Sequence, residues 1–384
     1  MKTNPALMYA ASASRRYYLP MKKRIRHWGA LPAPRGPTVL ITNHQHEDEG
    51  EVIFSSMFLE HPGIPMIAVN SRRTFETGFF AARLPWTAPL TRRLNLTNFW
   101  LQMGLLPIEN HLHSRALISL AEEVRRKHGD LTLETIFPDD VLARLELSGR
   151  RLADLWTPAY FTRAQTTVKL ANLKQPYRRE ALENFRATMS ADIAAVVEAV
   201  REGATFYVTP EGDFSLDGRL RPMRNGITDA VLPVAEPWLC AIAYDPFRGR
   251  RLSMLYRIVQ PANRDDLGAS LAAARAVTTS ALLATFLCSV DEPFAAAAAR
   301  RSVAAQLGAL PHNVFVDPEL ERAPDAVVTE ALTVLVRMGI LAAAGAKYRF
   351  TETRSDARFP HVADMVTYQR NMHEETITSA VRLQ

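Results

Sequence analysis

The chain has 384 residues, of which 47% are hydrophobic and 22% charged, a composition that excludes an intrinsically disordered protein. Its two cysteines can form neither a disulfide framework nor a four-thiolate zinc site, so a reduced, intracellular setting is expected. The net charge of +6 favours an anionic partner such as a phospholipid surface, a nucleic acid or a phosphorylated small molecule.

Short apolar runs that are rich in β-branched residues predict buried strands. These strands are expected at residues 38–43, 64–69, 205–209 and 252–260. Segments with helical periodicity predict helices at residues 51–60, 113–127 and 181–202. Because strands alternate with helices, we expect an α/β fold with a mainly parallel sheet covered by helices.

The pattern divides the chain into three expected regions. A basic, aromatic N-terminal segment (residues 1–35) precedes an α/β domain (residues 36–262) with a polar insertion near 130–180. Residues 263–384 form a helical C-terminal region, with an apolar helix at 325–342 and a short strand at 347–350. This last part predicts a small winged-helix-like appendage.

Basic and aromatic residues are interleaved at residues 15–28 and again at residues 72–100. Such a mixture suits a lipid interface, where rings lie at headgroup depth and cations meet anionic headgroups. The alternative is a set of core aromatics with a solvated basic rim. No apolar stretch reaches the ~18–20 residues of a spanning helix, and the N-terminus lacks the apolar core of a secretory signal.

A histidine and an acidic residue follow the first expected strand. His44 comes directly after Asn43, and Glu49 lies five positions later. Histidine titrates near neutrality and can act as a general base, while a carboxylate can fix its tautomer. The same spacing recurs in His46/Glu51 and His312/Asp317, so the spacing alone is not specific.

A second block, TFYVTPEGDFSLDGRLRPMRNG, occupies residues 205–226 and also begins with an expected strand. Together the two blocks resemble those of the glycerolipid acyltransferase family, the lysophosphatidate-acyltransferase-like group. Its members pair an Asn-His-x-Ser-x-x-Asp block with a later Phe-Pro-Glu-Gly-Thr-Arg-Ser block. The order is the same here, and the resemblance covers residues 22–260.

The resemblance implies a role for each matching residue. His44 takes the position of the catalytic base, and Glu49 replaces the family's aspartate, with Asp48 as a rival partner. Glu211 and Gly212 match the Glu-Gly pair, which in the family helps to seat the acceptor. In the same block Arg224 takes a basic position, and the apolar segment AVLPVA at residues 230–235 resembles a family strand.

Two departures from the family pattern bear on the acceptor. Asp213 and Phe214 stand where the family has Thr-Arg; an arginine there would favour a phosphate on the acceptor, so its absence argues against one. The family's middle block contains an arginine, and Asn110 stands at that place in the better apolar match. The candidates for this arginine are Arg115, or Arg178 and Arg179 further along the chain.

The resemblance implies an acyltransferase of phospholipid synthesis, lying on the cytoplasmic inner face of a membrane. It would move a fatty acyl group from acyl-CoA or acyl-carrier protein to a hydroxyl of a lyso-lipid or glycerol-phosphate-type acceptor, without a cofactor or metal. The alternative is a non-catalytic relative that binds acyl-CoA or lipid. Nucleic-acid binding is disfavoured because Arg337 is the one basic residue of the helix expected at 325–342.

Overall fold

The computed structural model describes residues 3–29, 32–33, 36–109, 113–223, 226–290 and 293–384. The chain forms two compact units, each treated by itself. Unit 1 comprises Met1–Met8 and Ile67–Ala199, and unit 2 comprises Tyr9–Met66 and Val200–Gln384. These boundaries differ from the expected division, because the C-terminal region belongs to the same unit as His44.

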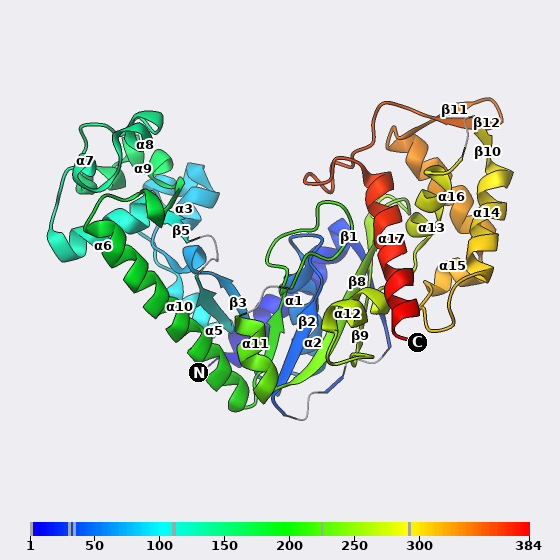
Figure 1. The fold of residues 1–384 in the computed structure, drawn as a ribbon, viewed down its shortest axis with the longest axis horizontal. Helices are drawn as coiled ribbons and strands as arrows, with labels where there is room; N and C mark the ends of the chain where they lie inside the picture. The colour runs from blue at the N-terminus through cyan, green and yellow to red at the C-terminus, as the bar shows by residue number, and fades with distance from the viewer. Residues whose placement is uncertain (1–2, 30–31, 34–35, 110–112, 224–225, 291–292) are drawn as a thin grey trace. The chain divides into compact units, whose positions relative to one another are not determined.

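Unit 2 contains a mixed, mainly parallel sheet, which confirms the α/β class (Figure 1). Its strands follow the order β1 (Lys23–Trp28), β9 (Leu252–Val259), β8 (Glu236–Asp245), β2 (Thr38–Thr42) and β7 (Thr205–Val208). Strand β2 runs parallel to β7 and β8, β1 runs parallel to β9, and β8 is antiparallel to β9. Every residue of β2 and β7 is buried, and the mainly apolar, β-branched runs in their sequences predicted both strands.

Helices of unit 2 cover the sheet, and three of those near its C-terminal end begin at side-chain caps. The C-terminal helix α17 (Met365–Arg382) packs on α12 (Leu267–Ala274) and α13 (Thr279–Leu287), and α12 packs on β8 (Figure 1). Asp266, Thr278 and Asp364 accept hydrogen bonds from backbone N–H groups at the starts of α12, α13 and α17. Helix α2 (Glu49–Glu60) also belongs to unit 2, and α1 (Pro5–Lys22) belongs to it from Tyr9 onwards.

The apolar segment at residues 230–235 is not the strand that the resemblance implied. It forms the end of α11 (Ile227–Val231) and a 3-10 turn (Leu232–Val234), and β8 begins only at Glu236. Pro233 in the turn fixes its backbone φ and has no N–H group to donate to a ladder. The strand therefore starts after the turn.

The end of unit 2 combines short helices with a small sheet. Strands β10 (Phe294–Ala295), β12 (Lys347–Phe350) and β11 (Leu341–Ala344) pair antiparallel in that order. The helices are α14 (Ala296–Gly308), α15 (Pro318–Arg322) and α16 (Pro324–Arg337), and α13, α14 and α16 pack together. The helix expected at 325–342 ends earlier, because Gly339 has φ 74° and β11 follows. The winged-helix-like assignment itself stays a prediction.

Unit 1 has a core of its own, and the expected insertion supplies much of it. Strand β3 (Met66–Ser71) pairs in parallel with β4 (Leu105–Ile108), and β5 (Ser114–Ala116) pairs antiparallel with β6 (Thr167–Lys169). The helices are α3 (Phe79–Arg83), α4 (Ala88–Thr91), α5 (Thr97–Gln102), α6 (Leu117–His128), α7 (Leu133–Ile136), α8 (Asp139–Arg144), α9 (Pro158–Ala164) and α10 (Tyr177–Arg201). Buried side chains from residues 130–180 pack against α6 and α10 in one cluster. The polar surface of this stretch therefore covers a continuous apolar interior.

The remaining short elements are 3-10 turns at Arg72–Phe75, Pro85–Thr87, Leu152–Trp156 and Leu170–Asn172. Of the helices in the described parts of the chain, none is both long enough and apolar enough to cross a bilayer.

Candidate functional site

The two sequence blocks meet beside the carboxyl end of β2. His44 Nδ1 lies 2.9 Å from Glu49 Oε2, and Glu49 is the fully buried first residue of α2. Its carboxylate also accepts hydrogen bonds of 3.0 Å from the backbone N–H groups of Gln45 and His46. Burial raises the pKa of Glu49 above its usual value, and the hydrogen bond from His44 acts in the opposite direction.

This arrangement determines which imidazole nitrogen can react. A carboxylate only accepts hydrogen bonds, so Nδ1 carries the proton in the neutral ring and Nε2 keeps its lone pair. The His44 side chain is 21% exposed. Among the residues that the structure describes, none hydrogen-bonds to its Nε2. His44 can therefore accept a proton from a hydroxyl group, with Glu49 stabilising the imidazolium that forms.

Two buried polar side chains hold the backbone of this loop. The Asn43 amide donates to the Ile242 carbonyl at 3.0 Å and accepts from the Ile242 N–H at 2.8 Å. Glu211 Oε1 accepts the backbone N–H of His44 at 2.8 Å, and Oε2 accepts that of Arg221 at 2.7 Å. The structure thus brings the first block together with the Pro-Glu-Gly turn.

Glu211 and Gly212 have different parts in this turn. Gly212 adopts φ 70°, a left-handed conformation that favours glycine, and its N–H donates to the Thr209 carbonyl at 3.1 Å. Glu211 is buried, which raises the pKa of its carboxyl group, while the two backbone amides oppose that rise. Since both oxygens of Glu211 bind backbone amides, this residue positions the loop around His44.

The rival partner of His44 is occupied elsewhere. Asp48 Oδ2 lies 2.8 Å from the buried Lys23 Nζ, and Lys23 Nζ lies 2.9 Å from His46 Nδ1. Burial and the nearby Lys23 lower the pKa of His46 to about 4, so its ring is neutral. Asp48 and His46 therefore form a structural cluster with Lys23, and Glu49 is the partner of His44.

The other occurrences of the His-x4-acid spacing have structural partners. Glu51 forms an ion pair with Arg15 at 2.8 Å. Asp317 caps α15 and binds the Arg26 guanidinium at 2.7 Å. In the described parts of the chain, no group of three or more His, Cys, Asp or Glu side chains is arranged to hold a metal ion.

Aromatic rings from the second block and the C-terminal region form a cluster beside His44 and His46. The centroid of the Phe214 ring lies 4.5 Å from that of His44, and the His361 ring stacks on Phe214 with the centroids 4.8 Å apart. Phe359 contacts the His46 ring edge-on at 5.5 Å. Sequence reasoning missed His361 and Phe359, because they lie outside the resembling region and have no motif of their own.

The arginines expected to bind a substrate are placed less simply. Arg115, in unit 1, is hydrogen-bonded to Glu109 and lies 2.7 Å from Glu123, so carboxylates already compensate its charge. Arg178 and Arg179 are exposed on α10. Arg224 and Asn110 lie outside the described residues.

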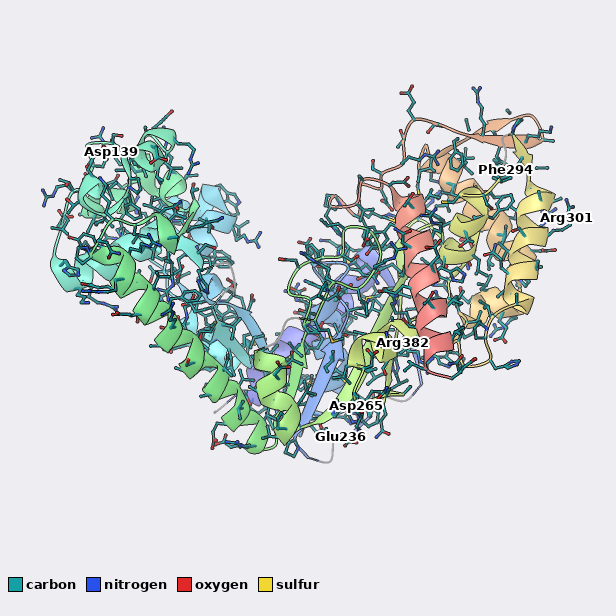
Figure 2. All side chains as sticks on the ribbon, in the orientation of Figure 1. Asp139, Glu236, Asp265, Phe294, Arg301 and Arg382 are labelled. Atoms are coloured by element: carbon teal, nitrogen blue, oxygen red, sulfur yellow. The ribbon has the colours of Figure 1, made fainter. Side chains whose placement is uncertain are left out.

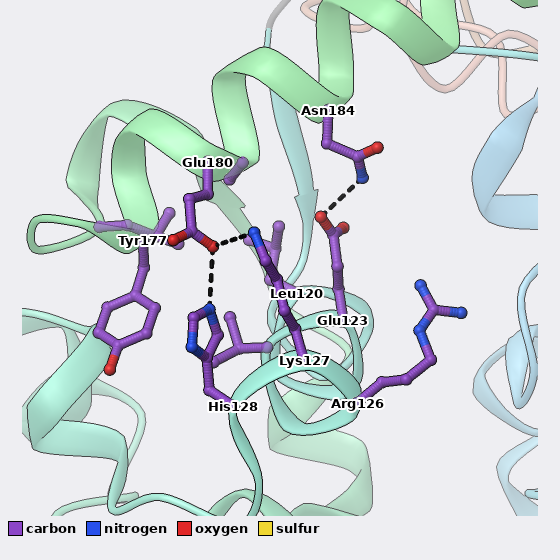
Figure 3. Close-up of a pocket in the computed structure, with 11 residues that line it drawn as sticks. Leu120, Glu123, Arg126, Lys127, His128, Tyr177, Glu180 and Asn184 are labelled. Atoms are coloured by element: carbon purple, nitrogen blue, oxygen red, sulfur yellow. Dashed lines mark hydrogen bonds and ion pairs between the residues drawn. The ribbon is translucent and has the colours of Figure 1, made fainter.

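Two cavities among the described residues bear on the site, one in unit 1 and one in unit 2. In unit 1, a cavity of about 430 Å³ lies between α6 and α10, where Lys127 and His128 both contact Glu180 (Figure 3). Of the predicted site residues that the structure describes, none lines that cavity. In unit 2, a groove of about 240 Å³ is lined by Glu211 and Arg221, together with parts of α12 and α17. The predicted block therefore borders the smaller of the two.

Neither a protein-family model nor a curated protein matches this chain.

Proposed function

We propose that the protein is an acyltransferase that moves a fatty acyl group from an acyl-CoA or acyl-carrier-protein thioester to a hydroxyl group of a lipid-type acceptor. The observation that carries this proposal is the His44–Glu49 pair, which leaves Nε2 of a partly exposed imidazole available beside the Pro-Glu-Gly turn. The resemblance of the two blocks to glycerolipid acyltransferases supports the same reaction. Glycerol phosphate, lyso-phospholipids and amino-acid lipids are the acceptors to consider.

The proposed reaction needs one base and no covalent enzyme intermediate. His44 Nε2 takes the hydroxyl proton while the hydroxyl oxygen attacks the thioester carbonyl. The tetrahedral intermediate collapses as the carbon–sulfur bond breaks, and the departing thiolate takes the proton from the imidazolium. Ester and thiol are the products, and His44 returns to its neutral form. Glu49 stabilises the imidazolium form of His44, because its carboxylate accepts the hydrogen bond from Nδ1–H throughout the reaction.

We also propose that the enzyme works on the surface of an anionic membrane, on its cytoplasmic side. Trp86 and Leu90 in unit 1 are 80% and 92% exposed, and Leu84, Leu94 and Phe99 are exposed as well. Large apolar side chains that face water over one short segment are typical of interaction sites. A tryptophan among them suits the headgroup region.

The basic charge of the same stretch favours contact with anionic lipid over the alternative, in which the aromatic residues belong to the core and the basic residues face water. No acidic residue occurs between Glu76 and Glu109, whereas Arg83, Arg92 and Arg93 lie among the exposed apolar residues. Basic side chains beside the apolar ones gain electrostatic attraction from anionic lipid.

The proposal is tested by comparing His44→Ala with His312→Ala. His312 is exposed and begins the same five-residue spacing, so it is a matched control. Thiol release from palmitoyl-CoA is measured with the acceptor panel and anionic vesicles. Removing a general base should slow turnover by about 10²–10⁴-fold, and the control should keep the wild-type rate. Wild-type turnover in folded His44→Ala would overturn the proposal.

The same assay separates the non-catalytic alternative. Phe214 stands where the family has an arginine and lies against the His44 ring, and this departure favours a protein that only binds its ligand. Saturable binding of palmitoyl-CoA without thiol release, for every acceptor, would favour that alternative.

A further inference from the structure

We infer that the groove of about 240 Å³ in unit 2 holds the distal part of the donor's acyl chain. This inference rests on the proposed function, since it assigns one of its substrates to a place. The groove is formed by residues 220–223, by α12 and by α17, which pack side by side (Figure 1). Arg382, labelled in Figure 2, is the last residue of α17 and also lines the groove.

The lining of the groove suits a hydrocarbon chain. Small and apolar residues form most of it: Leu220, Pro222, Met223, Gly268, Ala269, Leu271 and Ala272. Three of these, on α12, are glycine or alanine, and their small side chains leave the space that the groove occupies. Since an apolar cavity of ~150 Å³ accommodates benzene, a groove of this volume has room for about nine carbon atoms.

The charged side chains that line the groove already have partners. Glu211 binds two backbone amides, and Glu375 Oε2 accepts from the Leu220 N–H at 2.9 Å and from Arg275 at 2.6 Å. Arg221 lies 3.3 Å from Asp213, and Arg382 lies 2.7 Å from Asp266.

Because its charged side chains are already paired, the groove suits an uncharged ligand better than a charged one. A phosphate in the groove would displace existing ion pairs and face the carboxylates of Glu211 and Glu375. An uncharged chain disturbs none of them and removes apolar surface from water. The groove therefore favours the acyl chain over the acceptor's headgroup.

Glu211 connects the groove to the proposed base. Its side chain lines the groove, and its Oε1 accepts the backbone N–H of His44 at 2.8 Å. A chain bound there lies against the residue that positions His44. Filling the groove should therefore change which thioesters are used while leaving the His44–Glu49 pair intact.

The test is Gly268→Leu, which places a side chain in the groove from α12. A Cβ at this position would meet only Asp266 Oδ1, at 3.7 Å, so the variant has room to fold. Gly308→Leu is the matched control, because a Cβ there meets nothing within 4 Å and the residue ends a helix outside the groove. We compare kcat/KM for palmitoyl-CoA and butyryl-CoA.

We expect Gly268→Leu to lower kcat/KM for palmitoyl-CoA by about tenfold or more, because the new side chain displaces several methylene groups. Butyryl-CoA, too short to fill the groove, should change by less than about twofold, and Gly308→Leu should leave both values unchanged. Equal effects on the two thioesters, or an increase in KM for the acceptor alone, would overturn the inference without affecting the proposed function.

Absence of thiol release would refute the proposed function, and the groove is then tested by ligand binding alone. Titration with the fluorescent fatty acid cis-parinaric acid should give saturable binding to the wild type and about tenfold weaker binding to Gly268→Leu. Equal affinity of the two proteins, or no binding to the wild type, would overturn the assignment of the groove.

Discussion

Replacing Glu49 by glutamine tests the central pair without removing volume. The carboxylate accepts from His44 Nδ1 and from two backbone N–H groups, whereas a carboxamide has one acceptor oxygen and a donor NH₂. The amide NH₂ would meet Nδ1, so the imidazole would keep its proton on Nε2, the nitrogen that must accept one. We expect turnover to fall by about 10²–10⁴-fold. Losing a charge-assisted hydrogen bond at a buried site should lower the free energy of unfolding by ~1.5–3 kcal/mol.

Thiol release and urea denaturation measure the two effects in parallel, and two neighbours provide controls. Glu51→Gln, on the same helix, removes a 42% exposed carboxylate paired with Arg15; it should cost at most ~1 kcal/mol and keep full turnover. Asp48→Asn weakens the ion pair with the buried Lys23, so it should reduce stability more than activity. A folded Glu49→Gln protein with wild-type turnover, or an Asp48→Asn protein that lacks turnover while stable, would refute the reasoning.

Three further predictions concern the loop, acid stability and the membrane surface. Gly218→Ala should lower the free energy of unfolding by ~3 kcal/mol or more in urea, since φ is +92° and the new Cβ would lie 2.0 Å from the Tyr368 carbonyl oxygen; Gly249→Ala, at φ +66° without such a contact, should lose only ~1 kcal/mol. The pKa of His46 is about 4 in the folded protein, whereas an unfolded histidine binds a proton below its pKa of ~6.5, so the free energy of unfolding falls as pH decreases from ~6.5 to about 4. His46→Gln should reduce the slope of the free energy of unfolding against pH in this window by up to ~1.4 kcal/mol per pH unit. An unchanged slope would contradict a neutral, buried His46. Trp86→Ala and Leu90→Ala should each weaken sedimentation with phosphatidylglycerol vesicles several-fold, unlike Val381→Ala at an exposed apolar position of α17; equal losses in all three would count against the proposed surface.

The parts of the site that could be predicted are those fixed by short-range pattern and sheet geometry. Strands β2 and β7 are continuous apolar runs, and they were predicted because both are buried on both faces. Parallel neighbours place their carboxyl ends at one edge, so His44 after β2 and Glu211 after β7 had to approach each other. The meeting of the two blocks follows from these two strands.

Features that depend on distant partners could not be predicted. Strand β1 was not predicted, because the basic residues Lys23, Arg24 and Arg26 leave it without the apolar pattern of a buried strand. Acidic groups from other segments compensate these charges, as Asp317 does for Arg26. The choice of Glu49 over Asp48 depended on Lys23, which lies more than twenty residues upstream. Periodicity reports burial of a face and says nothing about which charge compensates which.

The C-terminal helix α17 helps to hold the backbone of the proposed site in place through a series of buried hydrogen bonds. Asn371 donates to the Asp217 carbonyl at 3.0 Å, and the buried Arg275 binds the Gly218 and Met372 carbonyls at 3.4 and 3.3 Å. These bonds fix the loop that follows Glu211, and Glu211 in turn fixes the backbone of His44. A buried guanidinium is tolerated here because carbonyl groups and a carboxylate surround it. Residues outside the resembling region therefore help to hold His44 in place, so the geometry of the proposed site depends on α17 as well as on the two blocks.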